Sequence, residues 1–150
     1  MKLPVAILAS LLVASAVPVT VAIAATAPTI VTPSQLQWAP GKGMPAGVKV
    51  AVLTGNPNAS GAYAVRLMLP DGTLFGPHFH GDAEWVTVLQ GTLMVGLGDK
   101  VDKTKMKALG PGSFVAVPAG LHHYAMAKGA TIIQLTGMGP MTMTAVKGSM

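Results

Sequence analysis

The sequence predicts an all-β fold of the sandwich or barrel type, and three observations support this fold class. Short runs rich in β-branched and aromatic residues follow one another, separated by Gly, Pro, Asn or Asp. After the apolar N-terminal segment, no window combines a helix cap with a 3.6-residue periodicity. Of the 150 residues, 51% are apolar and only 10% are charged, which favours one compact, largely buried domain over a disordered chain.

The first segment, residues 1–24, is expected to be a secretory signal peptide. A single lysine precedes a long uncharged stretch rich in Leu, Ala and Val, which ends in small residues. Ala22 and Ala24 occupy the two small-residue positions of a cleavage site, so we expect cleavage before Ala25, and residues 25–27 offer a second site. A retained membrane anchor is the alternative, because the run approaches the roughly 20 residues that cross a bilayer. Two internal prolines argue against it, and the mature protein is expected to be periplasmic or secreted, without membrane association.

The rest of the chain divides into an irregular lead-in, residues 25–45, and a β domain, residues 46–150. The lead-in is rich in Pro, Gln and Gly. The runs that we assign to strands are residues 48–55, 62–69, 84–90, 92–98, 112–119, 122–128, 131–137 and 141–146.

The charge distribution argues against a nucleic-acid-binding protein. The formal charge of +5 falls to +4 when Lys2 is removed with the signal peptide. Four lysines cluster within residues 99–107 beside two aspartates, and Arg66 is the only arginine. A nucleic-acid-binding face would be broader, with several arginines and interleaved aromatic residues. We interpret the lysine cluster as a solvated hairpin tip.

The chemistry of the chain is concentrated in its few histidines and its single glutamate. His78 and His80 are one residue apart, and Glu84 follows four residues later. On an extended segment these three positions face the same side. Two imidazoles and one carboxylate suit a divalent transition metal such as Fe, Mn, Ni, Cu or Zn. A fourth ligand from another strand would complete the protein's share and leave positions open for water or substrate.

This spacing resembles the first motif of the cupin superfamily, G(X)5HXH(X)3,4E(X)6G. Every fixed position is matched, by Gly72, His78, His80, Glu84 and Gly91. Two such matched motifs are a strong signal, whereas a lone HxH would be a weak one.

A second segment resembles the other cupin motif, G(X)5PXG(X)2H(X)3N, through Gly112, Pro118, Gly120 and His123. Ala127 replaces the final Asn, which is not one of the usual ligands, so this departure concerns the pocket more than the metal. The short stretch between the motifs resembles that of small single-domain bacterial members, the cupin_2-like proteins.

The resemblance implies a double-stranded β-helix, or jelly-roll barrel, that holds a metal through His78, His80, Glu84 and His123. A metal-free barrel is the alternative, since some cupins lack a metal. Homodimerisation is common in the families that this chain resembles, and the abundant apolar strands are compatible with a homodimer, but one sequence does not fix the oligomeric state.

His122 needs a separate interpretation, because strand alternation places it on the face opposite to His123. We expect a surface or core-edge histidine; the alternative is a role in supporting a ligand or transferring a proton. Phe79, Trp85 and Tyr124 also alternate away from the metal-facing set and are expected in the core or at an interface.

Arg66 and Gln134 are isolated polar residues in apolar strands, and the sequence leaves two interpretations of each open. They could line the pocket, where Arg66 would hold an anionic substrate near the metal, or they could face solvent. Ala125 and Ala127 are small and are expected to leave room for a ligand. The late methionines are expected to pack and to form the tail, with a soft Cu(I) site as the alternative; they are Met138, Met141, Met143 and Met150.

The function that these features favour is an exported metal-dependent enzyme, a dioxygenase-type protein that acts on a small organic molecule. Glu84 is the one candidate for acid or base catalysis, provided that it leaves the metal. The alternative is a non-catalytic module that senses or buffers a metal or a small ligand, because the fold does not decide between them. An open cavity beside the metal would favour the enzyme.

Overall fold

The computed structural model describes residues 27–148. The predicted signal peptide, its cleavage site and Met150 lie outside this range. Within it, the chain forms nine strands, two short 3-10 helices and no α-helix, so the all-β prediction is confirmed. No helix in this part of the chain is long and apolar enough to cross a bilayer. The elements in order are η1 (Pro33–Gln35), β1 (Ala39–Pro40), β2 (Lys49–Thr54), β3 (Gly61–Leu69), β4 (Leu74–Phe79), β5 (Glu84–Leu97), η2 (Lys103–Lys105), β6 (Lys107–Leu109), β7 (Phe114–Val117), β8 (His123–Gly139) and β9 (Thr144–Ala145).

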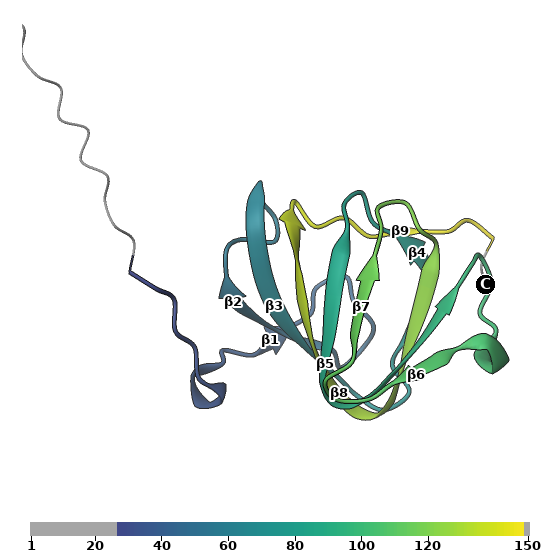
Figure 1. The fold of residues 1–150 in the computed structure, drawn as a ribbon, viewed down its shortest axis with the longest axis horizontal. Coiled ribbons are helices and arrows are strands. Elements are labelled where there is room, and N and C mark those ends of the chain that lie inside the picture. The colour runs from purple at the N-terminus through teal and green to yellow at the C-terminus, as the bar shows by residue number, and fades with distance from the viewer. Residues whose placement is uncertain (1–26, 149–150) are drawn as a thin grey trace, which may run out of the picture.

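The strands form two antiparallel layers, and the long strands β5 and β8 pass from one layer into the other (Figure 1). In the first layer the order is β1, β2, β3, the second half of β8, the first half of β5, and β7. In the second layer the order is β9, β4, the first half of β8, the second half of β5, and β6. This arrangement is the jelly-roll barrel that the resemblance implied.

A bend at Gly91 carries β5 from the first layer to the second. The pairing with β8 shifts register between Val88 and Gln90 and again between Gln90 and Thr92, and Gly91, within the second shift, has a φ of 75°. A Cβ atom at this position would collide with the carbonyl oxygen of Ala130 and lie 2.6 Å from the Thr131 hydroxyl oxygen. Glycine is therefore required both by the backbone conformation and by the close approach of β8.

The bends explain the main difference between the predicted strands and the observed ones. The runs 84–90 and 92–98 are two halves of β5, and the runs 122–128 and 131–137 are two halves of β8. The glycines between them mark bends within continuous strands and not chain reversals. The predicted runs also omit three short strands, β1, β4 and β6, because Pro, Gly or Lys interrupts their apolar pattern.

The core lies between the two layers and is built from alternate residues of the long strands. Val65, Leu67 and Leu69 of β3 are at most 3% exposed, and Val86 and Val88 of β5 pack in the same cluster. Ile133 and Leu135 of β8 complete this inner face. The site described next lies at one end of the same interior.

Candidate metal centre

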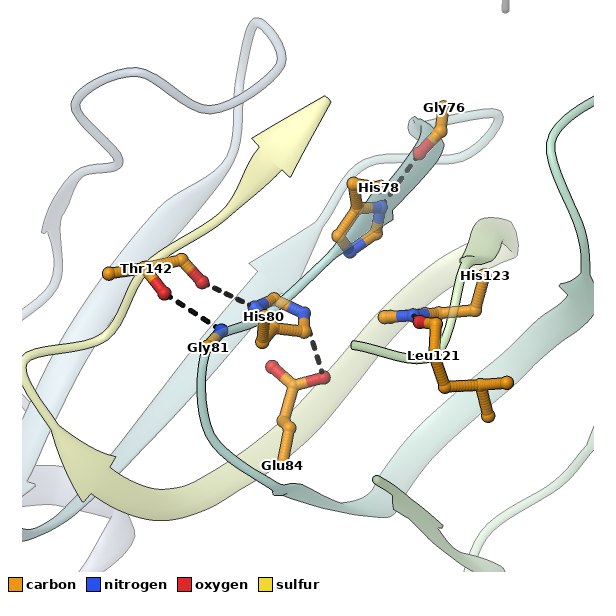
Figure 2. Close-up of polar contacts among 8 residues, drawn as sticks. All are labelled: Gly76, His78, His80, Gly81, Glu84, Leu121, His123 and Thr142. Atoms are coloured by element: carbon orange, nitrogen blue, oxygen red, sulfur yellow. Dashed lines mark hydrogen bonds and ion pairs between the residues drawn. The ribbon is translucent and has the colours of Figure 1, made fainter. Parts of the chain in front are cut away.

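Three histidines and one glutamate converge from three strands and the turn between two of them (Figure 2). His78 lies near the end of β4, and His80 follows that strand directly. Glu84 begins β5, and His123 begins β8. His78 and His123 are directly paired across the β4–β8 ladder, which brings residues from the two sequence motifs into contact.

The three imidazoles form a compact, buried cluster. Each ring can place one nitrogen within 4.8 Å of a nitrogen of the other two. The ring centres of His78 and His123 are 4.2 Å apart, and His80 lies 5.0 Å and 5.2 Å from them. The Glu84 carboxylate borders the cluster through His80, with 3.5 Å between its Oε2 and the His80 Nε2. All four residues are buried.

Hydrogen bonds to main-chain carbonyls orient all three rings. The Nδ1 atom of His78 donates to Gly76 O at 2.7 Å, and that of His123 donates to Leu121 O at 3.0 Å. The Nδ1 atom of His80 donates to Thr142 O at 2.6 Å. A carbonyl oxygen can only accept, so each Nδ1 carries the ring hydrogen, and each Nε2 of a neutral ring carries a free lone pair. The three rings thus have the tautomer that binds a metal through Nε2.

The site also contains an unpaired buried atom that fits a cation. Among residues 27–148, His80 Nε2 is the one buried side-chain nitrogen or oxygen without a hydrogen-bond partner. It lies 3.5 Å from Glu84 Oε2: a protonated His80 ring would form an ion pair there, and a neutral ring would leave two acceptor atoms facing each other. A bound metal ion would satisfy both groups, and three imidazole nitrogens with one carboxylate are a donor set suited to a divalent transition metal.

Burial sets the protonation of these groups. It lowers the pKa of His78 to about 4 and also lowers the pKa of His123, although a carbonyl bond opposes the shift in each ring. Burial raises the pKa of the Glu84 carboxyl, and the neighbouring His80 partly offsets this. His78 and His123 are therefore neutral near pH 7, so metal binding need not displace protons from these two rings.

A cavity of about 280 Å³ opens beside the cluster and is lined by the three histidines and Glu84. The remaining wall is almost entirely apolar. It includes Phe75, Val86, Val95, Val115, Ile133 and Leu135. Lys42 is the one cationic side chain among the lining residues.

The predicted pocket residues divide between the two faces of the wall. Arg66 and Gln134 do not line the cavity, so the interpretation that placed them there is wrong. They are paired across β3 and β8, and Arg66 Nε donates to Gln134 Oε1 at 3.2 Å. Their strand neighbours, Leu67 among them, line the cavity instead, because alternation turns adjacent residues to opposite faces. Ala125 lines the cavity as expected, whereas Ala127 belongs to the hydrophobic core.

His122 lies away from the cluster, as alternation predicts. Its Nδ1 donates to the Asp99 carboxylate at 2.6 Å, and its ring stacks on Phe79 at a centroid distance of 5.0 Å. Tyr124 is a core residue with 1% exposure. Trp85 is 39% exposed on the outer surface.

The cavity includes residues that the sequence did not assign to the site. Lys42 and Met44 come from the segment interpreted as an irregular lead-in, and Met141 and Met143 come from the C-terminal segment. The two late methionines thus line the site, beyond the packing role expected of them. The one available signal was the alternation of Met and Thr over residues 141–144, which places both methionines on one face.

Comparison with known proteins agrees with this architecture. The family profile described as Cupin matches residues 45–140, which is more than half of the chain. No curated protein sequence matches it significantly.

Solved structures resemble the chain at low sequence identity. The polyketide cyclase RemF from Streptomyces resistomycificus is 17% identical, with a TM-score of 0.67 over 80% of this chain and 86% of that one. A Methylibium petroleiphilum PM1 protein, provisionally described as an acetylacetone dioxygenase, is 20% identical, with a TM-score of 0.64 over 83% and 86% of the two chains. KdgF from Halomonas sp. is 21% identical, with a TM-score of 0.56 over 72% and 93%. At these identities the likeness establishes the fold.

Proposed function

This chain belongs to the cupin family, and we propose that it is an exported metal-dependent enzyme, of the oxygenase type, that acts on a small and mainly apolar organic molecule. His78, His80, Glu84 and His123 would hold the metal. The observation that carries the proposal is the buried Nε2 of His80, which has no hydrogen-bond partner and lies 3.5 Å from the Glu84 carboxylate beside a three-histidine cluster.

The cavity supports a small organic substrate. A volume of about 280 Å³ is near the lower end of the range for ligand pockets. The apolar wall would bind a hydrocarbon body and exclude water, while oxygen atoms of the substrate would be placed at the ligand cluster. Lys42 would attract an anionic oxygen to the cavity.

The protein side chains would position the substrate, and Glu84 would hold or release a proton beside it. When bound, a metal with open positions would supply Lewis-acid or oxygen-binding chemistry. Glu84 is the one acidic side chain among the cavity-lining residues, and its burial raises the pKa of its carboxyl. It would therefore hold or release a proton beside the substrate when it is not serving as a ligand.

The test of this proposal is metal analysis followed by oxygen uptake. The protein would be purified from its native compartment, its metal measured, and the metal-free form reloaded separately with Fe(II), Mn(II) or Zn(II). Oxygen consumption would then be recorded with small apolar β-diketones and catechols and, as polar controls, with hydroxy acids. The proposal predicts uptake with an apolar chelating compound and the redox metals. Tightly held Zn without turnover would support the non-catalytic binding module instead.

Export rests on the N-terminal sequence and needs its own measurement. Cell fractionation and N-terminal sequencing of the mature protein should place it in the periplasm or medium, beginning at Ala25. A cytoplasmic protein that retains its first residues would contradict this part of the proposal.

A further inference from the structure

The three histidines of the cluster are oriented in two different ways. For His78 and His123 the carbonyl that accepts the Nδ1 hydrogen lies two residues earlier on the same segment. For His80 it belongs to Thr142, which is 62 residues away. The first two rings are thus oriented by their own local backbone, whereas His80 depends on a remote segment.

That remote segment is Met141–Val146, which we call the strap. Figure 1 shows the C-terminal chain crossing between the two layers in the region of β9. Main-chain bonds hold its two ends: Met141 N–H donates to Pro57 O at 2.6 Å, and Val146 N–H donates to Pro77 O at 2.9 Å. Between them, β9 pairs with the end of β4 beside His78.

Thr142 makes two hydrogen bonds to the turn after β4, one to His80 and one to Gly81 (Figure 2). Its carbonyl oxygen accepts from His80 Nδ1, and its hydroxyl oxygen accepts from the Gly81 N–H at 2.9 Å. The side-chain bond holds the strap in register with the turn after β4. In this register the Thr142 carbonyl oxygen lies where His80 Nδ1 can donate to it.

We propose that the strap is a positioning element of the metal centre, in which Thr142 selects the His80 tautomer that leaves Nε2 free for the metal. Without this carbonyl, the His80 ring could rotate or carry its hydrogen on Nε2, and a protonated Nε2 cannot bind a metal. This inference rests on the proposed function, because it assumes that the cluster holds a metal.

The strap also forms part of the cavity wall. Met141 and Met143, on either side of Thr142, both line the cavity. The segment that orients a metal ligand therefore also shapes the space available to a substrate. A displaced strap would alter metal affinity and substrate selection together.

Four variants test the inference. Truncation after Pro140 removes the Thr142 carbonyl, and Thr142→Val removes only the hydroxyl that holds the strap to Gly81. Thr142→Ser restores that hydroxyl. Thr144→Val is the matched control, because in the described part of the chain the Thr144 side chain makes no hydrogen bond.

Two readouts are used, and neither depends on enzyme activity. One is the Zn²⁺ affinity of the metal-free protein, measured by competition with a chelator. The other is the tautomer of each histidine in the metal-free protein, measured from its ¹⁵N chemical shifts. His78 and His123 serve as internal controls, because their carbonyl partners remain in every variant.

We expect truncation to weaken Zn²⁺ binding by about 10- to 100-fold, the usual effect of losing a partner that orients a metal-binding histidine. Thr142→Val should weaken it by about threefold to tenfold, as for one lost hydrogen bond. The serine variant and the Thr144 control should stay within about twofold of the unmodified protein. In the truncated protein His80 alone should show mixed tautomers.

The inference is overturned if Zn²⁺ affinity and the His80 tautomer are unchanged in the valine variant and in the truncation. If the truncated protein does not fold, the valine and serine pair decides the question. An unmodified protein that binds no divalent metal would refute the proposed function instead, and the tautomer measurement would still report whether the strap orients His80.

Discussion

The inner and outer faces of the barrel wall are made from adjacent residues of the same strands, yet their chemistry differs sharply. On β3, Leu67 lines the cavity while Arg66 pairs with Gln134 on the other side. At the start of β8, His123 joins the buried histidine cluster, whereas His122 pairs with Asp99 near the surface. Residue type alone does not say which face a side chain occupies; its position in the strand does.

The largest expected effect contrasts His123 with its neighbour. His123→Ala should weaken Zn²⁺ binding by more than about 100-fold, because removing a ligand costs more than removing a ligand's partner. His122→Ala should leave the affinity within about twofold, since its partner Asp99 is exposed. Chelator competition measures both, and equal losses would show that the wrong histidine was assigned to the metal.

The next effect contrasts Leu67 with Arg66. Leu67→Ala should lower the free energy of unfolding by about 2 kcal/mol, the low end for a buried leucine, because one side of Leu67 faces a cavity. Arg66→Ala should cost less than about 1 kcal/mol, because the side chain is only partly buried. Urea denaturation of the metal-free variants provides the comparison. A larger loss for the arginine variant would contradict the assignment of faces.

A smaller effect concerns Glu84 on the inner face, where one substitution should change metal affinity without changing stability. Glu84→Gln should weaken Zn²⁺ binding by about tenfold, because the amide supplies no negative charge. In the metal-free protein the same change should not lower the free energy of unfolding at pH 7, because the buried position disfavours a carboxylate. A parallel loss of affinity and stability would indicate that Glu84 has a structural role.

The last expected effect is a pH dependence of the metal-free protein. The folded pKa of His78 is about 4, below its ordinary value of 6.5, so between these values the unfolded state binds more protons. Stability should fall as the pH is lowered from about 6.5 to 4. His78→Asn should remove this contribution, whereas the opposite contribution of Glu84, whose pKa is raised, should remain in both proteins. Thermal denaturation in buffers containing a chelator, with the two proteins compared at each pH, measures the difference.

The motifs predicted the fold, and the residues that they single out lie together in the structure, because the spacing within each motif is a local property of the chain. The separation of His78, His80 and Glu84 is a local property of one segment. The face that Arg66 occupies was left open for a different reason: its neighbours in β3 are apolar on both faces, so residue type does not mark one face as the inner one. The contribution of Thr142 was hidden for another reason: its main chain, 62 residues from His80, makes the bond, and any residue carries a carbonyl.

This reliance on main-chain acceptors has an evolutionary consequence. The carbonyls of Gly76, Leu121 and Thr142 persist through any substitution that preserves the path of the chain. Gly76 and Leu121 can therefore be substituted while His78 and His123 keep their orientation, whereas Thr142 also contributes a side-chain hydroxyl. Relatives in which main-chain carbonyls orient the histidines in the same way would be recognised by superposing their structures. Sequence alignment alone would not identify them.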